Sequence, residues 1–175
     1  MALKDLVRTI PDYPKPGIMF RDITTLIEDA AGFKQTIDEM VNPLREMEIT
    51  RVAGIDARGF ILGGAMAHEL STGFIAIRKR GKLPHATHVV EYELEYGIDA
   101  LEIHTNSVAP GDRIYLVDDL IATGGSACAA IELIQLSGGI VAGAGFAIDL
   151  PDLGGRQKLE DMGIQVHTLM HFEGD

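Results

Sequence analysis

The stretch DRIYLVDDLIATGGSACAAIELIQL, residues 112–136, decides the fold. Its first seven residues centre on an apolar run of Ile, Tyr, Leu and Val, which predicts a buried strand over residues 112–118. A loop with two adjacent glycines follows, and then apolar residues recur at helical spacing until Gly138 and Gly139 end the pattern. The stretch is therefore a strand joined to a helix by a glycine-containing loop.

The same unit recurs on both sides of this stretch. Apolar residues three and four apart predict a helix over residues 30–48, kinked or ended near Pro43. The other predicted elements are strands at 51–56, 73–79, 140–150 and 164–172 and helices at 59–70 and 155–162. Repeated strand–helix units predict an α/β fold, a mostly parallel twisted sheet flanked by helices. Ligands of such sheets bind at the carboxyl ends of the strands.

Two segments depart from this pattern. Residues 9–29 hold three of the seven prolines, and residues 80–100 are polar and aromatic with only some alternation. We expect both to be loops or small appendages over the ligand-binding end of the sheet. No internal repeat or linker divides the chain, so residues 1–175 are expected to form one domain, with a hood at about 1–29 and a flexible loop at about 80–100.

Composition excludes several classes of protein. A chain of 175 residues with 46% hydrophobic residues has the material for a full core, which excludes global disorder. The net charge of −11 disfavours general nucleic-acid binding, because a phosphate backbone would meet a repulsive field. Cys128 is the single cysteine, and charged residues near Met1 interrupt any signal-peptide core. No apolar stretch is long enough to span a membrane, so we expect a reduced, cytoplasmic protein.

Residues 117–126, VDDLIATGGS, have the composition of a phosphate-binding loop. Backbone N–H groups at a helix start attract anions, glycines allow close approach, and Thr123 and Ser126 add hydroxyl groups. Asp118 and Asp119 would repel a bare phosphate, so they favour a ligand that also carries hydroxyls or a metal, such as a phosphorylated sugar. On residue types alone, a simple turn with capping residues fits equally well.

Other common motifs are absent. The chain has no Gly-x4-Gly-Lys-Ser/Thr sequence, and Gly143-Ala144-Gly145 is followed by Ile148 where a dinucleotide-binding motif needs Gly or Ala. His68-Glu69 lacks the second histidine of a zinc helix, so His68 is interpreted as an ordinary helix residue.

The loop at 117–126 resembles the ribose-5-phosphate loop of the type I phosphoribosyltransferases. Four further motifs resemble the adenine-specific members of that family, in the same order and spacing over residues 5–170: FRDIT (20–24), DARGF (56–60), RKRGKLP (78–84) and LEYG (94–97). Ser126 stands where the family commonly has Thr, and residues 85–91 match no family pattern. The resemblance implies the type I phosphoribosyltransferase fold and the reaction of adenine with 5-phosphoribosyl-1-pyrophosphate (PRPP) to give AMP and pyrophosphate.

The resemblance also implies roles for individual residues. The ribose-5-phosphate site would comprise Asp118, Asp119, Ala122, Thr123, Gly124, Gly125 and Ser126. The pyrophosphate site would comprise Arg58, Arg78, Lys79 and Lys82. Arg58 would stabilise the leaving group, and Mg²⁺ would be held mostly by substrate and water, with protein ligands unknown. The adenine site would comprise the Phe20 ring and the backbone of Met19 and Arg21. Glu95 and Tyr96 would close over the site, with Glu95 a candidate for proton transfer.

Each assignment has a plainer alternative. The cations at 78–82 also fit a solvated basic loop, although their place after a predicted strand favours a functional cluster. Phe20 also fits a core position and Glu95 an ordinary strand position.

Two other functions remain open. One is a PRPP-sensing regulator, which would need a DNA-binding segment for which this chain has no room. The other is a transferase for xanthine or hypoxanthine, against which the motifs at 20–24 and 94–97 argue. Family resemblance, and no physical argument, also implies a homodimer.

Overall fold

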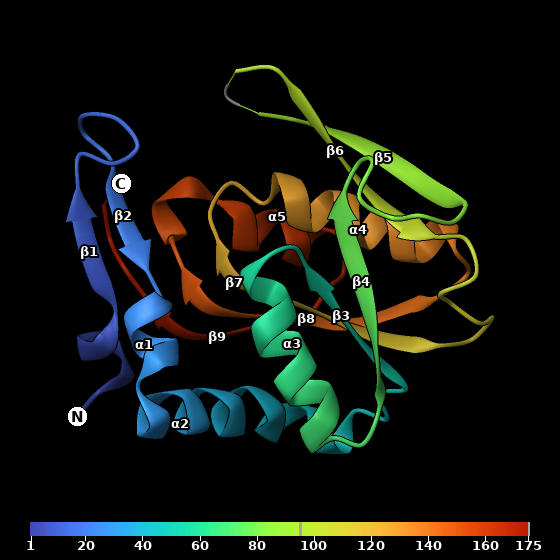
Figure 1. Ribbon diagram of the computed structural model, residues 1–175, viewed down its shortest axis with the longest axis horizontal. Helices are drawn as coiled ribbons and strands as arrows, with labels where there is room; N and C mark the ends of the chain where they lie inside the picture. The colour runs from blue at the N-terminus through green and yellow to red at the C-terminus, as the bar shows by residue number, and fades with distance from the viewer. Residues whose placement is uncertain (95, 175) are drawn as a thin grey trace.

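The computed structural model describes residues 1–94 and 96–174. Seven of its strands form one sheet in the order β5-β6-β4-β3-β7-β8-β9 (Figure 1). The five parallel strands are β3 (Arg51–Ile55), β4 (Gly73–Lys79), β7 (Arg113–Ile121), β8 (Ile140–Asp149) and β9 (Val166–His171). At the β4 edge, β6 (Ile98–His104) and β5 (Thr87–Glu93) extend the sheet in antiparallel fashion.

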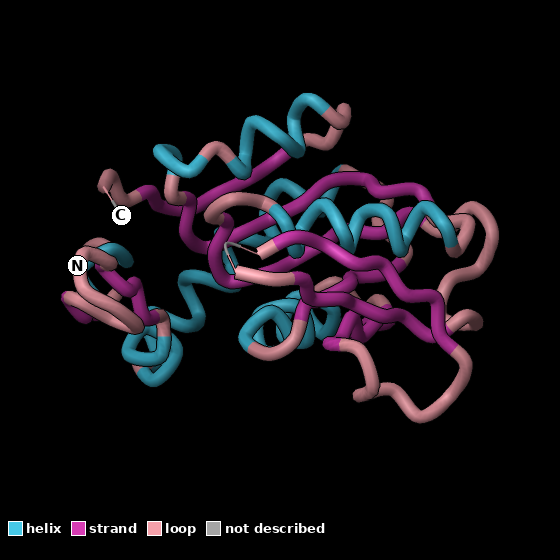
Figure 2. The backbone as a smooth tube through the Cα atoms, turned by 90° about the horizontal axis from the view of Figure 1, so that it is seen from above, coloured by secondary structure: helices cyan, strands magenta, loops and turns pink. Residues whose placement is uncertain are grey.

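Helices cover both faces of this sheet, as Figure 2 shows from above. The helices are α2 (Ala30–Val41) and α3 (Arg58–Glu69) on one face, and α4 (Gly125–Leu136) and α5 (Gly155–Asp161) on the other. Successive strand residues point to opposite faces, so Val52 packs with α2 and α3 while Ala53 packs with α4 and α5. Both faces are apolar, which explains why the strands are nearly continuous hydrophobic runs.

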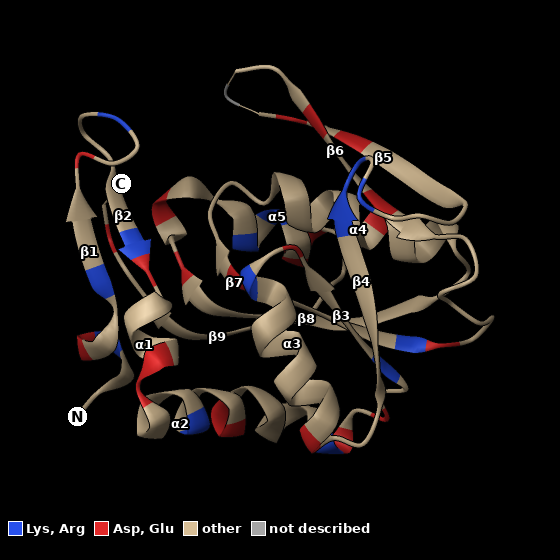
Figure 3. Cartoon of the chain, viewed as in Figure 1, with Lys and Arg blue, Asp and Glu red and all other residues tan. Residues whose placement is uncertain are grey.

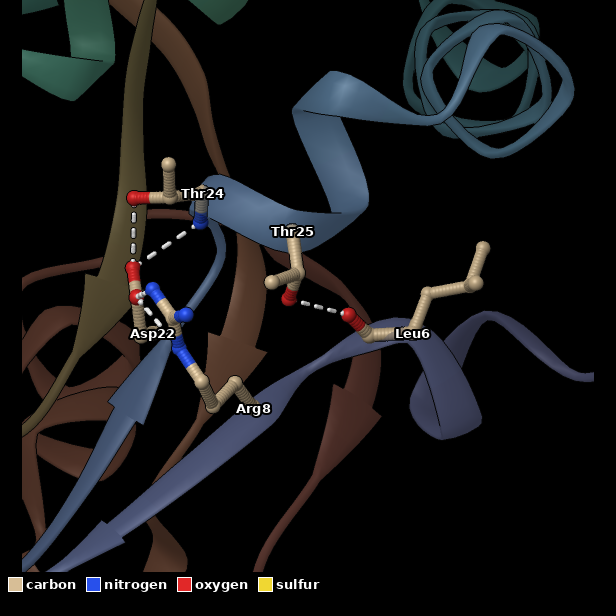
Figure 4. A network of polar contacts seen from close by, with 5 residues as sticks. All are labelled: Leu6, Arg8, Asp22, Thr24 and Thr25. Atoms are coloured by element: carbon tan, nitrogen blue, oxygen red, sulfur yellow. Dashed lines mark hydrogen bonds and ion pairs between the residues drawn. The ribbon is translucent and has the colours of Figure 1, made fainter.

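The hood is a small layer beside β9. It consists of the 3-10 helix η1 (Leu3–Leu6), the antiparallel strands β1 (Arg8–Pro11) and β2 (Met19–Asp22), and helix α1 (Thr24–Glu28). Figure 4 shows the polar contacts that hold it together: Asp22 pairs with Arg8 at 2.5 Å and accepts hydrogen bonds from the N–H and hydroxyl of Thr24. The Thr25 hydroxyl donates to the Leu6 carbonyl at 2.6 Å.

Asp22 is held as a carboxylate by this network. The hydrogen bond from the Thr24 hydroxyl, together with Arg8 and the Thr24 N–H, outweighs burial and lowers the pKa of Asp22 from 3.8 to about 2. The charge therefore persists at every physiological pH.

The predicted α/β fold is confirmed, and four segments differ in detail. The helix predicted over 30–48 ends at Val41 and continues as the 3-10 helix η2 (Asn42–Glu46), because Pro43 has no N–H for a further α-helical turn. The segments predicted as irregular are partly regular: residues 9–29 contribute β1, β2 and α1. The predicted flexible loop at 80–100 is largely a hairpin formed by β5 and β6. Alternate residues of β5, among them Val90 and Tyr92, pack against the core.

Strand β7 is longer than predicted. It continues to Ile121 because β8 extends beside it, with Asp118 opposite Phe146 and Leu120 opposite Ile148. Asp119, which was predicted to follow the strand, consequently lies within its last part together with Asp118. No helix among the described residues is long and apolar enough to cross a membrane. A third 3-10 helix, η3 (Pro151–Leu153), connects β8 to α5.

Candidate functional site

The chemistry-bearing motifs meet at the edge where the parallel strands end. Figure 1 shows the hood at the left and the β5–β6 hairpin at the upper right of this edge. Figure 3 shows positive charge at the end of β4 and at the start of α3, with negative charge on β7 nearby. The two appendages also touch, because the Lys15 Nζ lies 4.8 Å from the centre of the Tyr96 ring.

The loop between β7 and α4 forms a small cavity. Ala122 and Thr123 turn the chain, Gly124 adopts a φ of +87°, and α4 begins at Gly125. The cavity has a volume of about 370 Å³ and is lined by residues 120–127 and by Tyr92, Glu93 and Leu94 of the hairpin. It therefore joins the free N–H groups of a helix start to the hydroxyls of Thr123 and Ser126.

Gly155 supports this loop from behind. Its N–H donates to the Ala122 carbonyl at 2.9 Å. A Cβ atom at position 155 would lie 2.4 Å from the Ala122 oxygen and 2.7 Å from the Gly124 nitrogen. Only glycine allows this approach, so the first residue of α5 fixes the shape of the loop.

Arg58 and the two aspartates form one charged group. The Arg58 Nε lies 2.5 Å from the Asp119 Oδ2, and the Asp119 side chain is only 10% exposed. Burial opposes the charge of Arg58, but Asp119, with Asp118 and Asp22 further away, raises its pKa. Gly59 brings the start of α3 against β7, since a Cβ there would lie 2.9 Å from the Val117 carbonyl oxygen.

Asp118 differs from Asp119 in that its surroundings disfavour the charged form. Burial, followed by the negative charge of Asp119, raises its pKa well above the usual value. Its Oδ1 accepts a hydrogen bond from the Asp119 N–H at 2.8 Å. Of the two carboxylates, Asp119 is thus compensated by a cation, while Asp118 favours a proton or a ligand that donates hydrogen bonds.

The cations at the end of β4 have carboxylate partners of their own. The Arg78 Nε pairs with the Asp56 Oδ2 at 3.0 Å. The Lys79 Nζ contacts Asp99 and also donates to the Tyr92 hydroxyl. Burial opposes the charge of Lys79, but its contacts with Asp99 and Tyr92 raise its pKa. These pairs join the cluster to the hairpin and to the loop after β3.

The hood places the three predicted base-contacting residues on β2. Met19 is 41% exposed, and the Phe20 ring meets the Tyr13 ring edge to face, with 5.2 Å between their centres. The Arg21 guanidinium lies over the Phe172 ring at 4.5 Å, and its Nη1 donates to the Thr9 hydroxyl. Arg21 therefore anchors the hood with its side chain.

Comparison with known proteins places this arrangement in a family. The family model described as a phosphoribosyl transferase domain matches residues 24–152. An adenine phosphoribosyltransferase of Methylorubrum extorquens is 60% identical over 173 residues, covering 99% of this chain and 96% of that protein. The chain belongs to the adenine phosphoribosyltransferase family.

Solved adenine phosphoribosyltransferase structures share the fold over nearly the full chain. The enzyme of Rhodothermus marinus matches with a TM-score of 0.92 and 46% identity, covering 97% of this chain and 96% of that one. The enzyme of Saccharomyces cerevisiae, complexed with adenine and an imino-altritol bisphosphate, matches with a TM-score of 0.89 and 36% identity, covering 95% and 96%. The predicted adenine phosphoribosyltransferase resemblance is confirmed.

Most predicted site residues of this family member gather at the strand ends, but not all. Tyr96 is 79% exposed in the turn of the β5–β6 hairpin, where Lys15 of the hood contacts its ring. Glu95 lies outside the described residues. Asp56 lies in the motif at 56–60, but its pairing with Arg78 was not predicted. The sequence did not single out Gly155 or Asp99, because their contacts come from distant parts of the chain. For Gly155, the sequence indicated only the start of a helix.

Proposed function

We propose that this protein transfers a 5-phosphoribosyl group from PRPP to adenine, forming AMP and pyrophosphate. The observation that carries the proposal is the cavity at the start of α4, with Asp118 and Asp119 beside it and cations at the neighbouring strand ends. Membership of the adenine phosphoribosyltransferase family supports it. An anion-binding cavity beside two carboxylates suits one ligand that carries both a phosphate and sugar hydroxyls.

The 5-phosphate occupies the cavity between Ala122 and Ser126 in this proposal. Backbone N–H groups and the hydroxyls of Thr123 and Ser126 donate to its oxygens, and Gly124 and Gly125 leave room for close approach. Asp118 and Asp119 accept hydrogen bonds from the ribose hydroxyls. The carboxylates thus orient the sugar at one end while the cavity fixes its phosphate at the other.

The bond changes occur at ribose C1. The C1–oxygen bond to pyrophosphate breaks, the oxygen keeps the electron pair, and the adenine N9 forms the new bond and loses its proton. Positive charge develops on the ribose and negative charge on the leaving group. Arg58, Arg78, Lys79 and Lys82 stabilise the departing pyrophosphate. The hairpin excludes water that would otherwise hydrolyse the sugar, with Tyr96 at its tip and Glu95 proposed as the proton acceptor.

The adenine edge is read by the backbone of Met19 and Arg21. Pro11 lies opposite Met19 and has no N–H, so this pair cannot exchange two hydrogen bonds. Hydrogen-bonded and non-hydrogen-bonded pairs alternate along an antiparallel ladder. Phe20 should therefore form the hydrogen-bonded pair with β1, which leaves the N–H and C=O groups of Met19 and Arg21 directed away from β1. One extended strand can therefore offer a donor beside an acceptor, while the Phe20 ring stacks on the base.

Mg²⁺ fits this site as an ion brought with the substrate. Asp118 and Asp119 supply the oxygen donors that Mg²⁺ prefers, but the described residues contain no group of three or more His, Cys, Asp or Glu side chains that could hold a metal ion. When bound, Mg²⁺ would neutralise negative charge on the pyrophosphate. The protein's own contribution is to place one carboxylate pair beside those hydroxyls.

A comparison of purine bases tests the proposed function. Release of pyrophosphate from PRPP is measured with adenine, hypoxanthine and guanine at equal concentrations. Adenine should be preferred by up to about 10⁴-fold in kcat/KM, because a carbonyl in place of the amino group leaves buried groups unpaired. Equal kcat/KM for adenine and hypoxanthine would contradict the assignment and favour a transferase of broader or different base specificity.

We also propose that the protein works in the cytoplasm as a homodimer. The single half-buried Cys128 suits a reducing compartment. Exposed Ile61 and Phe74 are large apolar side chains that a second subunit would cover. Light scattering during size-exclusion chromatography measures the mass, and a value matching the 18.9 kDa monomer would contradict the dimer.

A further inference from the structure

Glu102 is a buried acid that the reaction described above does not use. It lies on β6, directly opposite Arg78 of β4, and is only 3% exposed. A buried carboxylate is costly unless hydrogen-bond donors surround it. The groups that donate hydrogen bonds to Glu102 therefore indicate which part of the structure its charge stabilises.

The donors around Glu102 come from the turn that follows β4. The Leu83 N–H donates to Oε1 at 2.8 Å, and the Thr87 hydroxyl approaches Oε2 at 3.3 Å. Burial opposes its charge, but hydrogen bonding from the Leu83, Gly81 and Thr87 groups, and from the Lys82 N–H, lowers the pKa of Glu102. The turn wraps its backbone N–H groups around the carboxylate, helped by a φ of +87° at Gly81.

This turn carries the basic side chains of the site. Arg78 and Lys79 end β4, Arg80 and Lys82 lie in the turn, and the Arg78 Nη1 also approaches the Lys82 carbonyl oxygen at 3.5 Å. The backbone on which these cations stand is thus fixed to β6 by the Glu102 carboxylate, together with the hydrogen bond from the Arg80 N–H to the Ala100 carbonyl at 3.1 Å.

We propose that Glu102 is a positioning residue for the pyrophosphate group, acting by holding the turn at residues 80–83 in the conformation that presents its cations. The inference rests on the proposed function and deepens it. An anion of the protein occupies the ring of N–H groups that would otherwise attract a phosphate. Pyrophosphate is therefore bound by side chains at this turn, whereas the 5-phosphate is bound by backbone N–H groups at the start of α4.

The test compares Glu102→Gln with a control of the same chemistry. Asp112 also holds a turn, accepting from the Ala109 N–H at 2.8 Å and the Thr50 hydroxyl at 2.9 Å, but it precedes β7 at the opposite end of the sheet. Asp112→Asn therefore reports the general cost of losing such a carboxylate. For both variants we measure the KM for PRPP, the KM for adenine, the Tm, and the affinity for pyrophosphate with Mg²⁺ by calorimetry.

Glu102→Gln should raise the KM for PRPP and weaken pyrophosphate binding by on the order of tenfold to a hundredfold, because displaced cations lose their alignment. The KM for adenine should stay unchanged, and Asp112→Asn should lower the Tm without changing either KM. In Glu102→Ala, formate should restore pyrophosphate affinity by filling the vacated space, while chloride at equal ionic strength should not.

Two results would overturn the role of Glu102. One is unchanged pyrophosphate affinity in Glu102→Gln; the other is a parallel rise of both KM values with the fall in Tm that Asp112→Asn shows. Because pyrophosphate calorimetry needs no turnover, it judges Glu102 even if the wild-type protein makes no AMP. Failure of the wild-type protein to form AMP would count against the proposed function separately.

Discussion

Replacing Gly155 with Ala tests whether the back of the 5-phosphate loop controls the use of PRPP. The new Cβ would stand 2.4 Å from the Ala122 carbonyl oxygen, whereas ordinary contact begins at 3.4 Å. The two nearest neighbours of this methyl group are backbone atoms of Ala122 and Gly124, and the Ile121 Cγ1 lies 2.9 Å away, so the loop or the start of α5 must move by about 1 Å. A misplacement of that size costs on the order of 10² in rate, even without contact to the reacting atoms.

The expected result is a fall in kcat/KM for PRPP on the order of 10², with adenine affinity unchanged because the hood is untouched. Overpacking should also cost about 1–3 kcal/mol of unfolding free energy, or roughly 2–12 °C in Tm. Steady-state kinetics with each substrate varied in turn, adenine calorimetry and a thermal melt measure these effects.

Gly64→Ala provides the control. Gly64 is also helical, but nothing lies within 4 Å of its added Cβ, so activity should not change and stability should rise slightly. A folded Gly155→Ala protein with wild-type kcat/KM for PRPP would refute the reasoning, because it would show that the loop's shape does not depend on α5.

Three further predictions concern the charged residues. Arg58→Ala should lower kcat by on the order of 10² to 10³ yet leave AMP binding nearly unchanged, since AMP has no pyrophosphate; kinetics and an AMP titration check this, and the reverse pattern would count against it. Asp118→Asn should lower kcat/KM for PRPP but raise the Tm above about pH 4. Burial and Asp119 raise the pKa of Asp118 in the folded state, so its ionisation costs stability as the pH rises. A Tm below that of the wild-type protein at pH 8 would contradict this. Asp22→Asn should cost about 2 kcal/mol of unfolding free energy near neutral pH, because Thr24 lowers the pKa of Asp22 to about 2 and the carboxylate stabilises the fold above about pH 4. Denaturant titrations should show this cost shrinking toward pH 2. A cost that is the same at every pH would show that it does not come from the charge of Asp22.

The parallel part of the sheet was predictable because its pattern is local. Each of its strands is an apolar run next to a helix with three- and four-residue spacing, and β7 with α4 shows this within one stretch. The hairpin was not predicted, since β5 alternates only weakly and its register depends on pairing with β6. The last residues of β7 were likewise assigned to a loop, because only the neighbouring β8 extends the strand to Ile121.

The site was predictable where one motif carries the chemistry and unpredictable where distant segments meet. The loop at 117–126 combines glycines, hydroxyls and carboxylates in ten residues, and its composition alone indicates an anion. Glu102 has no such signal, because its partners at 81–83 and 87 become neighbours only when β4 and β6 pair. The long-range contact of Gly155 with Ala122 is hidden for the same reason.

The ion pairs at the strand ends mean that an anionic ligand would replace carboxylates that already neutralise the cations, rather than bind to unpaired cations. Arg58, Arg78 and Lys79 each hold a carboxylate of the protein before any substrate arrives. In the proposed reaction, an incoming pyrophosphate would compete for cations that are already paired. Each exchange would release a carboxylate that can accept a hydrogen bond from a hydroxyl or bind a hydrated metal ion. Capture by long-range attraction is correspondingly weak, so the association rate of PRPP should depend only mildly on ionic strength.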